Sequence, residues 1–262
     1  MPGGTARHVR IQPMKEFIYS RNAVYETLVA KRRACFQLLL AEGIQEKGRI
    51  PAILEMAAER NIYVARLPRP ALDKIHPAHQ GVALETGDYP YVNVVDILER
   101  AEELKQPPFL LILDSLNDPL NFGSLLRTAE AVGVQGVILP LAHSVEVTPA
   151  VVNASSGASE HLLIAQANLS QAMDELQQAN TWVVGLDEKG ETYTPGHESR
   201  LQGGLALVVG SEGGGIRPLV RSKCDFLLRL PMAGRIDSLN AAVAGSVVLY
   251  LAFLKRYGAE NG

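Results

Sequence analysis

From residue 107 to the end of the chain, apolar runs alternate with segments of mixed polarity. Six short runs are apolar on both faces of a strand, and most segments between them have the three-to-four-residue spacing of amphipathic helices. The predicted strands cover 109–114, 134–140, 161–166, 181–187, 205–210 and 226–231. The predicted helices cover 123–132, 148–158, 170–179, 216–222 and 238–254. Because strands without a polar face are typical of parallel sheets covered on both sides, the pattern predicts an α/β domain.

Residues 16–88 have a shorter pattern that predicts a second, smaller α/β unit. Ser20, a residue type that caps helices, opens its first predicted helix. The predicted helices cover 20–30 and 50–61, and the predicted strands cover 36–41, 62–68 and 81–86. The turn-rich stretch TGDYPY at 86–91 separates the two units, and a helix over 94–106 follows it. The expected division is a flexible tail over 1–15, a domain over 16–88, a linker and leading helix over 89–106, and a domain over 107–262.

Charge is distributed unevenly along the chain, whose net charge is −3. Residues 1–88 contain 13 Lys and Arg against 9 Asp and Glu, which gives +4, and the remainder contains 12 against 19, which gives −7. A basic first segment favours contact with a polyanion, and random surface variation is the alternative. The candidate residues for this contact are Arg21, Lys31, Arg32 and Arg33. The cluster at 31–33 has an alternative role, which is to complement the dipole of the first helix at its C-terminus.

Composition excludes several classes of protein. No apolar run approaches the ~18 residues that a membrane span needs, and the N-terminus lacks the apolar segment of a signal peptide. We therefore expect a cytoplasmic protein without membrane contact. Cys35 and Cys224 lie far apart in apolar segments and have no metal-binding spacing, which predicts buried, reduced thiols and no metal site.

Three polar or glycine-rich loops directly follow predicted strands and lead into helices: NDPLNFGSLLR at 117–127, GSEGGGIR at 210–217 and MAGRIDSLNAAVAG at 232–245. Ligands of parallel α/β sheets bind beyond the carboxyl ends of the strands, so these loops form the candidate site. The second loop matches neither common glycine motif for nucleotides, and Glu212 would repel phosphates. It favours a neutral or cationic ligand, with a tight turn and a solvated Glu212 as the structural alternative.

The third loop combines a candidate helix cap with a run of small residues. Ser238 precedes the last predicted helix, where it either caps the helix or lines the site. Ala241, Ala242, Ala244 and Gly245 would let this helix approach another backbone closely. Such an approach suits either a tight internal layer or a subunit interface.

The motifs NDPLNFGSLLRTA, VVGSEGGGIRP and LPMAGRIDSLNAAVAG resemble, in order and spacing, those of the SpoU/TrmH family of RNA ribose 2′-O-methyltransferases. The resemblance spans residues 107–256, and residues 17–88 resemble the ribosomal-protein-like RNA-binding domain of bacterial members that methylate a guanosine of large-subunit rRNA. It implies a parallel-sheet SPOUT methyltransferase domain whose C-terminal segment forms a trefoil knot, which the residue pattern itself gives no reason to expect. It also implies a homodimer with S-adenosylmethionine at the interface.

The resemblance further implies roles for individual residues. Arg127 matches the family's catalytic arginine, and since a guanidinium is essentially never deprotonated, we interpret it as a phosphate-binding and charge-stabilising group. Pro119 would stiffen the first loop, and Gly123 would allow a close approach. Ala241 and Ala242 depart from the Val and Ser that the family commonly has, so this chain lacks that serine hydroxyl. The other expected catalytic residues are Asn121, Glu212, Ser238 and Asn240, and the expected cofactor-binding residues are Gly210, Gly213, Leu230, Met232, Gly234 and Leu239.

Other functions fit the sequence less well. A nicotinamide-dependent oxidoreductase would need GxGxxG after its first strand and an acidic residue ending the second, and neither pattern is present. A non-catalytic RNA-binding assembly protein would not need the five predicted catalytic residues, all of which are intact. The sequence therefore predicts an S-adenosylmethionine-dependent RNA 2′-O-methyltransferase, acting on rRNA or, alternatively, on tRNA.

Overall fold

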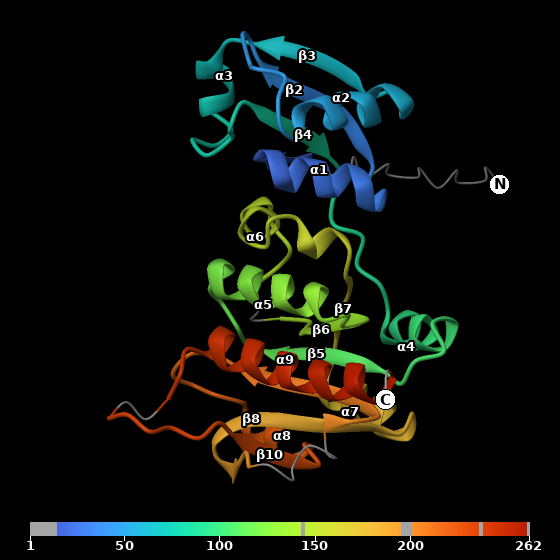
Figure 1. Ribbon diagram of the computed structural model, residues 1–262, viewed down its shortest axis with the longest axis vertical. Helices are drawn as coiled ribbons and strands as arrows, with labels where there is room; N and C mark the ends of the chain where they lie inside the picture. The colour runs from blue at the N-terminus through green and yellow to red at the C-terminus, as the bar shows by residue number, and fades with distance from the viewer. Residues whose placement is uncertain (1–14, 143–144, 195–200, 236–237, 261–262) are drawn as a thin grey trace, which may run out of the picture.

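Two separate β-sheets lie one above the other along the long axis of the molecule in the computed structural model (Figure 1). The structure describes residues 15–142, 145–194, 201–235 and 238–260, with side chains described as far as residue 256. The predicted tail over 1–15 therefore lies almost wholly outside the described residues.

The N-terminal sheet has four strands in the order β1-β4-β2-β3, in which β2 and β3 are parallel and β4 is antiparallel to both its neighbours. The strands are β1 (Glu16–Tyr19), β2 (Cys35–Ala41), β3 (Tyr63–Leu67) and β4 (Val82–Thr86). The helices are α1 (Arg21–Ala30), α2 (Ile50–Glu59) and α3 (Arg69–Asp73). The sequence pattern predicted neither β1 nor α3. Ser20 precedes α1 as expected, but its side chain makes no capping hydrogen bond.

The second sheet has six strands, all parallel, in the order β10-β8-β9-β5-β6-β7. The strands are β5 (Phe109–Asp114), β6 (Gly136–Pro140), β7 (Leu163–Ala167), β8 (Thr181–Thr192), β9 (Gly204–Gly210) and β10 (Phe226–Arg229). The helices are α4 (Val94–Glu103), α5 (Pro119–Ala131), α6 (Pro149–Ala154), α7 (Leu169–Gln178), α8 (Pro218–Ser222) and α9 (Ala241–Glu260), with a 3₁₀ turn, η1 (Ala158–Glu160), after α6. The predicted parallel α/β domain is thereby confirmed.

Helices cover both faces of this sheet because its strands are apolar on both faces. One core layer joins alternate strand residues, such as Leu111 and Leu207, to α5, α6 and α9. The opposite layer joins residues such as Ile112 and Val208 to α4, α7 and α8. The first layer continues through α6 into the core of the N-terminal sheet, where Val24 of α1 belongs to it. The two sheets therefore share one apolar core.

Two helices, α5 and α9, begin three or four residues from their predicted starts, and capping explains both. α5 begins at Pro119 because Asp118 accepts a hydrogen bond from the Leu120 amide at 3.0 Å and proline fits the first helical position. α9 begins at Ala241, and Asn240 caps it by accepting hydrogen bonds from the Ala242 and Val243 amides. Ser238 is therefore not the cap of α9.

Both cysteines are free thiols and are half-buried rather than fully buried. Burial raises the pKa of Cys35, and burial together with nearby aspartates raises the pKa of Cys224 to about 12. Among the described residues, no helix is long and apolar enough to span a membrane, and no group of three His, Cys, Asp or Glu side chains is placed to hold a metal ion.

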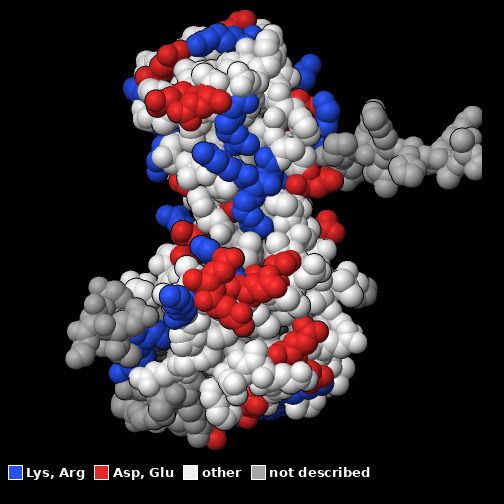
Figure 2. All heavy atoms as spheres, turned by 90° about the vertical axis from the view of Figure 1, so that its right-hand side faces the viewer, with Lys and Arg blue, Asp and Glu red and all other residues white. Residues whose placement is uncertain are grey.

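The uneven charge of the sequence is visible on the surface. Basic side chains run down one face of the upper domain to its junction with the lower domain (Figure 2). Acidic side chains gather on the lower domain directly below them. On this face the longest run of basic side chains therefore lies next to the acidic side chains of the lower domain, although both domains also carry charges of the other sign.

Candidate functional site

The glycine loop after β9 is a closed, tight turn. The Ser211 amide donates to the Gly215 carbonyl oxygen at 3.0 Å, and the Gly215 amide donates back to the Ser211 carbonyl oxygen at 2.9 Å. At Gly210 a Cβ would lie 2.2 Å from the Gly215 carbonyl carbon, so no other residue fits there. Gly213 and Gly215 have φ angles of +82° and +61°, which favour glycine. The glycines thus build the turn itself.

A buried carboxylate fixes the far end of this turn. Asp114, the last residue of β5, is fully buried and lies 2.6 Å from Arg217 Nε. It also accepts a hydrogen bond from the Arg217 amide at 2.7 Å. Asp114 was not predicted as a site residue, although an acidic residue that ends an all-apolar strand was a signal for it.

Asn240 joins the three loops that the sequence singled out. Its Nδ2 donates to Asn121 Oδ1 in the first loop at 3.3 Å and to Glu212 Oε1 in the second at 3.4 Å. Its Oδ1 meanwhile caps α9. Glu212 is exposed but bound to Asn240, so it is not simply a solvated side chain of a turn.

A pocket of about 530 Å³ opens between these loops, at the carboxyl ends of β9 and β10 and beside residues 186–189 of β8. Four of its lining residues are glycines, Gly210, Gly213, Gly214 and Gly215, which suits recognition of a ligand through backbone hydrogen bonds. Of the predicted residues, it is lined by Gly210, Glu212, Gly213, Leu230, Met232, Ser238, Leu239 and Asn240. Gly234 instead lines an adjacent cavity of about 490 Å³, together with Leu230 and Met232.

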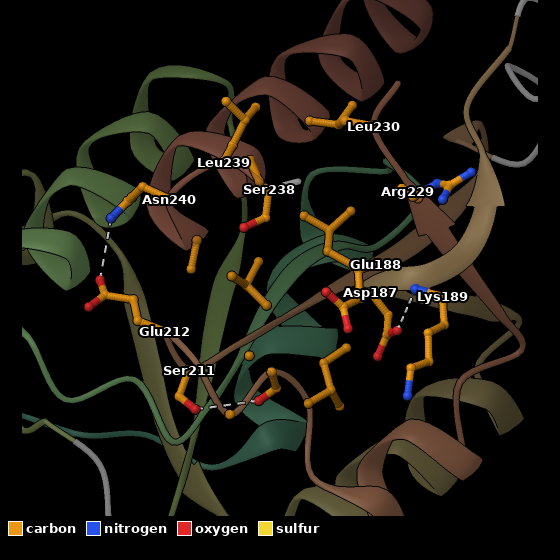
Figure 3. A pocket seen from close by; sticks show the side chains of 18 of the residues that line it. Asp187, Glu188, Lys189, Ser211, Glu212, Arg229, Leu230, Ser238, Leu239 and Asn240 are labelled. Carbon is orange, nitrogen blue, oxygen red and sulfur yellow. Dashed lines mark hydrogen bonds between the residues drawn. The ribbon is translucent and has the colours of Figure 1, made fainter. Parts of the chain in front are cut away.

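The wall opposite Leu239 and Asn240 carries charged residues that were not predicted (Figure 3). Asp187, Glu188 and Lys189 stand there because β8 continues five residues beyond its predicted end at residue 187. Arg221 Nε lies 3.3 Å from Asp187 Oδ2, and the Lys189 amide donates to Asp187 Oδ1 at 2.8 Å. The pocket is thus lined by three carboxylates, those of Asp187, Glu188 and Glu212, and by three cationic side chains, those of Lys189, Arg221 and Arg229.

Arg127 does not line the pocket. It lies six residues after Asn121 on α5, which turns its side chain by about 120° away from that residue at about 100° per residue. Its exposed guanidinium Nη1 donates to Ser156 Oγ at 3.4 Å. The close approach expected at Gly123 is between two segments of this chain. A Cβ at Gly123 would lie 2.5 Å from Ala154 Cβ and 2.8 Å from the Ser155 nitrogen. Gly123 therefore packs α5 on α6.

The predicted RNA-binding residues occupy different environments. Lys31 is exposed at the end of α1, and Arg21 is bound within its own domain to Gln80 and to the Lys47 carbonyl oxygen. Arg32 is half-buried, with hydrogen bonds to Tyr89 and to the carbonyl oxygens of Pro90, Glu160 and Leu162. The structure contradicts an RNA contact for Arg33, because its side chain is 0% exposed and is bound to Glu160 and Glu16.

Comparison with known proteins identifies the family. Residues 108–250 match the SpoU rRNA methylase family, and residues 17–92 match the substrate-binding domain of RNA 2′-O ribose methyltransferases. The chain is 40% identical over 243 residues to YacO of Bacillus subtilis (strain 168), whose name places it among TrmH family tRNA/rRNA methyltransferases; the match covers 92% of this chain and 96% of YacO. A TrmH family protein of Staphylococcus aureus (strain MSSA476) is 41% identical over 242 residues, with 92% and 96% covered.

Solved structures agree with this fold. The SpoU methyltransferase AviRb of Streptomyces viridochromogenes, in complex with AdoMet, has a TM-score of 0.77 at 22% identity, over 93% of this chain and 91% of AviRb. The chain therefore belongs to the SpoU/TrmH family of RNA 2′-O-methyltransferases, as its three motifs predicted. The trefoil knot stays a prediction.

Proposed function

We propose that this protein methylates the ribose 2′-hydroxyl of a guanosine in large-subunit rRNA, with S-adenosylmethionine as methyl donor. The main support is the meeting of all three sequence motifs at Asn240, beside the pocket at the carboxyl ends of the strands. In this proposal residues 16–88 hold the RNA, residues 89–106 connect the domains, and residues 107–262 transfer the methyl group.

The pocket fits S-adenosylmethionine in size and charge. Its volume of about 530 Å³ is in the range of small-molecule sites. The pocket carries both carboxylates and cationic side chains, which suits a ligand with both positive and negative groups, as S-adenosylmethionine has. When bound, S-adenosylmethionine supplies an activated methyl group. The main chain at Gly210, Leu230 and Leu239 would hold its adenosine and methionine parts.

Arg127 is proposed to act on the RNA side of the reaction. An oxygen–carbon bond forms from the ribose 2′-oxygen as the sulfur–carbon bond breaks, so S-adenosylhomocysteine leaves and the hydroxyl proton passes to water or phosphate. An exposed guanidinium can bind the adjacent phosphate and stabilise charge that develops on the oxygen. Ser238 would line the pocket beside Leu239.

Substitution of Arg127 tests this assignment. We expect Arg127→Ala to lower methyl transfer about a hundredfold or more, because a charge-stabilising group is removed. Affinity for S-adenosylmethionine should stay near wild type, because Arg127 lies outside the pocket. The measurements are transfer of labelled methyl groups to RNA and calorimetric titration of the cofactor.

The matched control is Arg100→Ala, which removes another exposed arginine from a helix on the opposite face of the sheet. Wild-type turnover of Arg127→Ala on its RNA would exclude Arg127 as a catalytic residue.

The target within RNA is the finer part of the proposal. The rRNA assignment is supported by the resemblance of residues 17–88 to the domain of rRNA-guanosine enzymes. A tRNA target is the alternative, because a structure named for 2′-OH methylation of C/U34 on tRNA matches 58% of this chain with a TM-score of 0.51. Mapping ribose methylation across rRNA and tRNA in a strain that lacks the gene distinguishes the two.

A homodimer is proposed from the exposed face of α9. Four large apolar residues follow one another there, a fifth lies two residues before the helix, and the five are 39% to 52% exposed. They are Leu239, Val243, Val247, Tyr250 and Leu254. Leu239 also lines the pocket, so a second copy that covers this face would border the site. Burial of such a stripe is a driving force for association.

A further inference from the structure

The substrate-binding domain packs on α6 of the methyltransferase domain and on residues 155–162 directly after it, which we call the joint segment. α1 lies directly above the α6 region that precedes it (Figure 1). The Tyr89 hydroxyl donates to the Leu162 carbonyl oxygen at 2.7 Å, and His161 Nε2 lies 2.9 Å from Glu26 Oε2. The C-terminal end of the segment is thus bound to residues of the smaller domain and its linker.

A buried ion pair lies at the centre of this contact. Arg33 Nε lies 2.9 Å from Glu160 Oε2, and Arg33 Nη2 lies 3.0 Å from Glu160 Oε1, which is a two-point pairing. Arg33 Nη1 also lies 2.8 Å from Glu16 Oε2. The Arg33 and Glu160 side chains are 0% and 1% exposed, respectively. Burial acts to lower the pKa of Arg33, but attraction to Glu160 and Glu16 outweighs it and raises that pKa.

Such a pair is better suited to fixing geometry than to adding stability. The cost of removing two charges from water largely offsets their attraction, so apolar residues of similar size would stabilise the contact as well or better. A two-point guanidinium–carboxylate pair, however, is satisfied at one distance and one angle. With Glu16 on β1 and Glu160 in the other domain, Arg33 therefore specifies a single orientation of the two domains.

The joint segment also contacts the helix that carries Arg127. Ser156 Oγ accepts the hydrogen bond from Arg127 Nη1 at 3.4 Å. Next to it, the main chain at Ser155 lies so close to Gly123 that a Cβ at Gly123 would stand 2.8 Å from the Ser155 nitrogen. The same short segment thus touches Arg33 of the small domain and Arg127 of the catalytic helix.

We propose that Arg33 and Glu160 are positioning residues for methyl transfer: their ion pair sets the orientation of the substrate-binding domain, and of the RNA it holds, relative to Arg127. This inference rests on the proposed function. It assigns to Arg33 a role through domain geometry in place of direct contact with RNA.

The test is Glu160→Gln in the full-length protein, with Glu46→Gln as the matched control. Glu46 pairs with Arg66 at 2.6 Å on the exposed surface of the small domain, and both partners belong to that domain. Total RNA from a strain that lacks the gene serves as methyl acceptor. We expect Glu160→Gln to lower kcat about tenfold or more, as misplacement of reacting groups does. KM for RNA and affinity for S-adenosylmethionine should stay within about threefold, because neither binding surface is altered.

Small-angle scattering measures the domain arrangement independently of activity. Glu160→Gln should broaden the distance distribution, whereas Glu46→Gln should match the wild type in scattering and in kcat. If Glu160→Gln changes the scattering but leaves kcat unchanged, the inference is overturned. It is also overturned if Glu160→Gln lowers kcat without a change in scattering. Unchanged scattering with unchanged kcat overturns it too.

Two further outcomes are distinguishable. Wild-type protein that methylates none of this RNA contradicts the proposed function, and in that case the scattering comparison alone decides whether the pair sets domain orientation. If Glu160→Gln does not fold, Arg33→Lys replaces it, since lysine keeps the charge but loses the two-point geometry. A smaller fall in kcat at unchanged KM is then expected, and wild-type kcat overturns the inference.

Discussion

Ser20 has a backbone conformation that residues with side chains rarely adopt. Its φ and ψ angles are 78° and 151°, in a region populated almost only by glycine. The residue is buried, and its hydroxyl makes no capping hydrogen bond that would offset the strain. Such a conformation costs on the order of 1–3 kcal/mol. The turn between β1 and α1 therefore stores strain.

We predict that Ser20→Gly stabilises the protein by about 1 kcal/mol, because relief of strain exceeds the added entropy of glycine in the unfolded chain. Urea denaturation measures the free energy of unfolding. Ser170→Gly in the first turn of α7 is the control, and it should be neutral or destabilising because Ser170 is helical. A lower stability for Ser20→Gly would show that the serine is favoured there for another reason.

Gly210 and Gly213 are expected to respond differently to alanine. A methyl group at Gly210 would stand 2.2 Å from backbone, whereas at Gly213 it would meet nothing within 4 Å and suffer only the strain of φ +82°. We predict that Gly210→Ala weakens S-adenosylmethionine binding more than about tenfold and Gly213→Ala less, because only the former must open the turn. Calorimetry on variants of confirmed fold measures both, and the reverse order would exclude this turn as the wall of the cofactor site.

The sequence predicted that the three loops meet at one edge of the sheet, but not how the charged residues around them are used. Glu212 and Asn240 lie in loops that follow parallel strands, so the topology alone brings them to one edge. Arg33 was misinterpreted because a charged residue usually lies on the surface, and its partner Glu160 is 127 residues away in sequence. Asp114 was missed for the same reason, since Arg217 is 103 residues away.

At the scale of elements, the six strands of the larger sheet were predicted because strands buried on both faces appear in the sequence as short, continuous apolar runs. β1 was missed because it has only four residues and pairs with β4, about 70 residues later, so no local pattern signals it. The helix starts shifted because the capping side chain decides them, as Asp118 and Asn240 do for α5 and α9.

The apolar stripe on α9 gives a prediction about assembly. We expect Val243→Glu to convert the proposed dimer to a monomer, because a carboxylate would be buried without a partner in the interface. Light scattering coupled to size-exclusion chromatography measures the mass. Val95→Glu, a change at a residue 55% exposed on α4, is the control and should leave the mass unchanged. If Val243→Glu retains the dimer mass, or the wild type is monomeric, the stripe is not the interface.

At the scale of the whole molecule, the charge division predicts how RNA affinity depends on salt. Lys31 and Lys105 are matched, because each is exposed and follows a helix with φ near +55°, at 56° and 54°. Lys31 lies in the basic part and Lys105 in the acidic part. We predict that Lys31→Gln reduces the slope of log affinity against log salt by about 1, as loss of one phosphate contact does, and that Lys105→Gln does not. Filter binding at several salt concentrations measures the slopes. Equal slopes for Lys31→Gln and Lys105→Gln would show that Lys31 does not contact the RNA.

The shared core between the two sheets bears on how such proteins diversify. A substrate-binding domain that is connected only by a linker, without a shared core, can be exchanged between proteins by recombination. Here Val24 belongs to the same apolar cluster as the residues of α5 and α9, and Arg32 donates to main-chain oxygens of the other domain. A substrate-binding domain taken from another protein would have to reproduce this apolar surface, Arg32 and Arg33. New RNA targets in this lineage are therefore expected to arise by substitution on the exposed face of the small domain rather than by domain exchange.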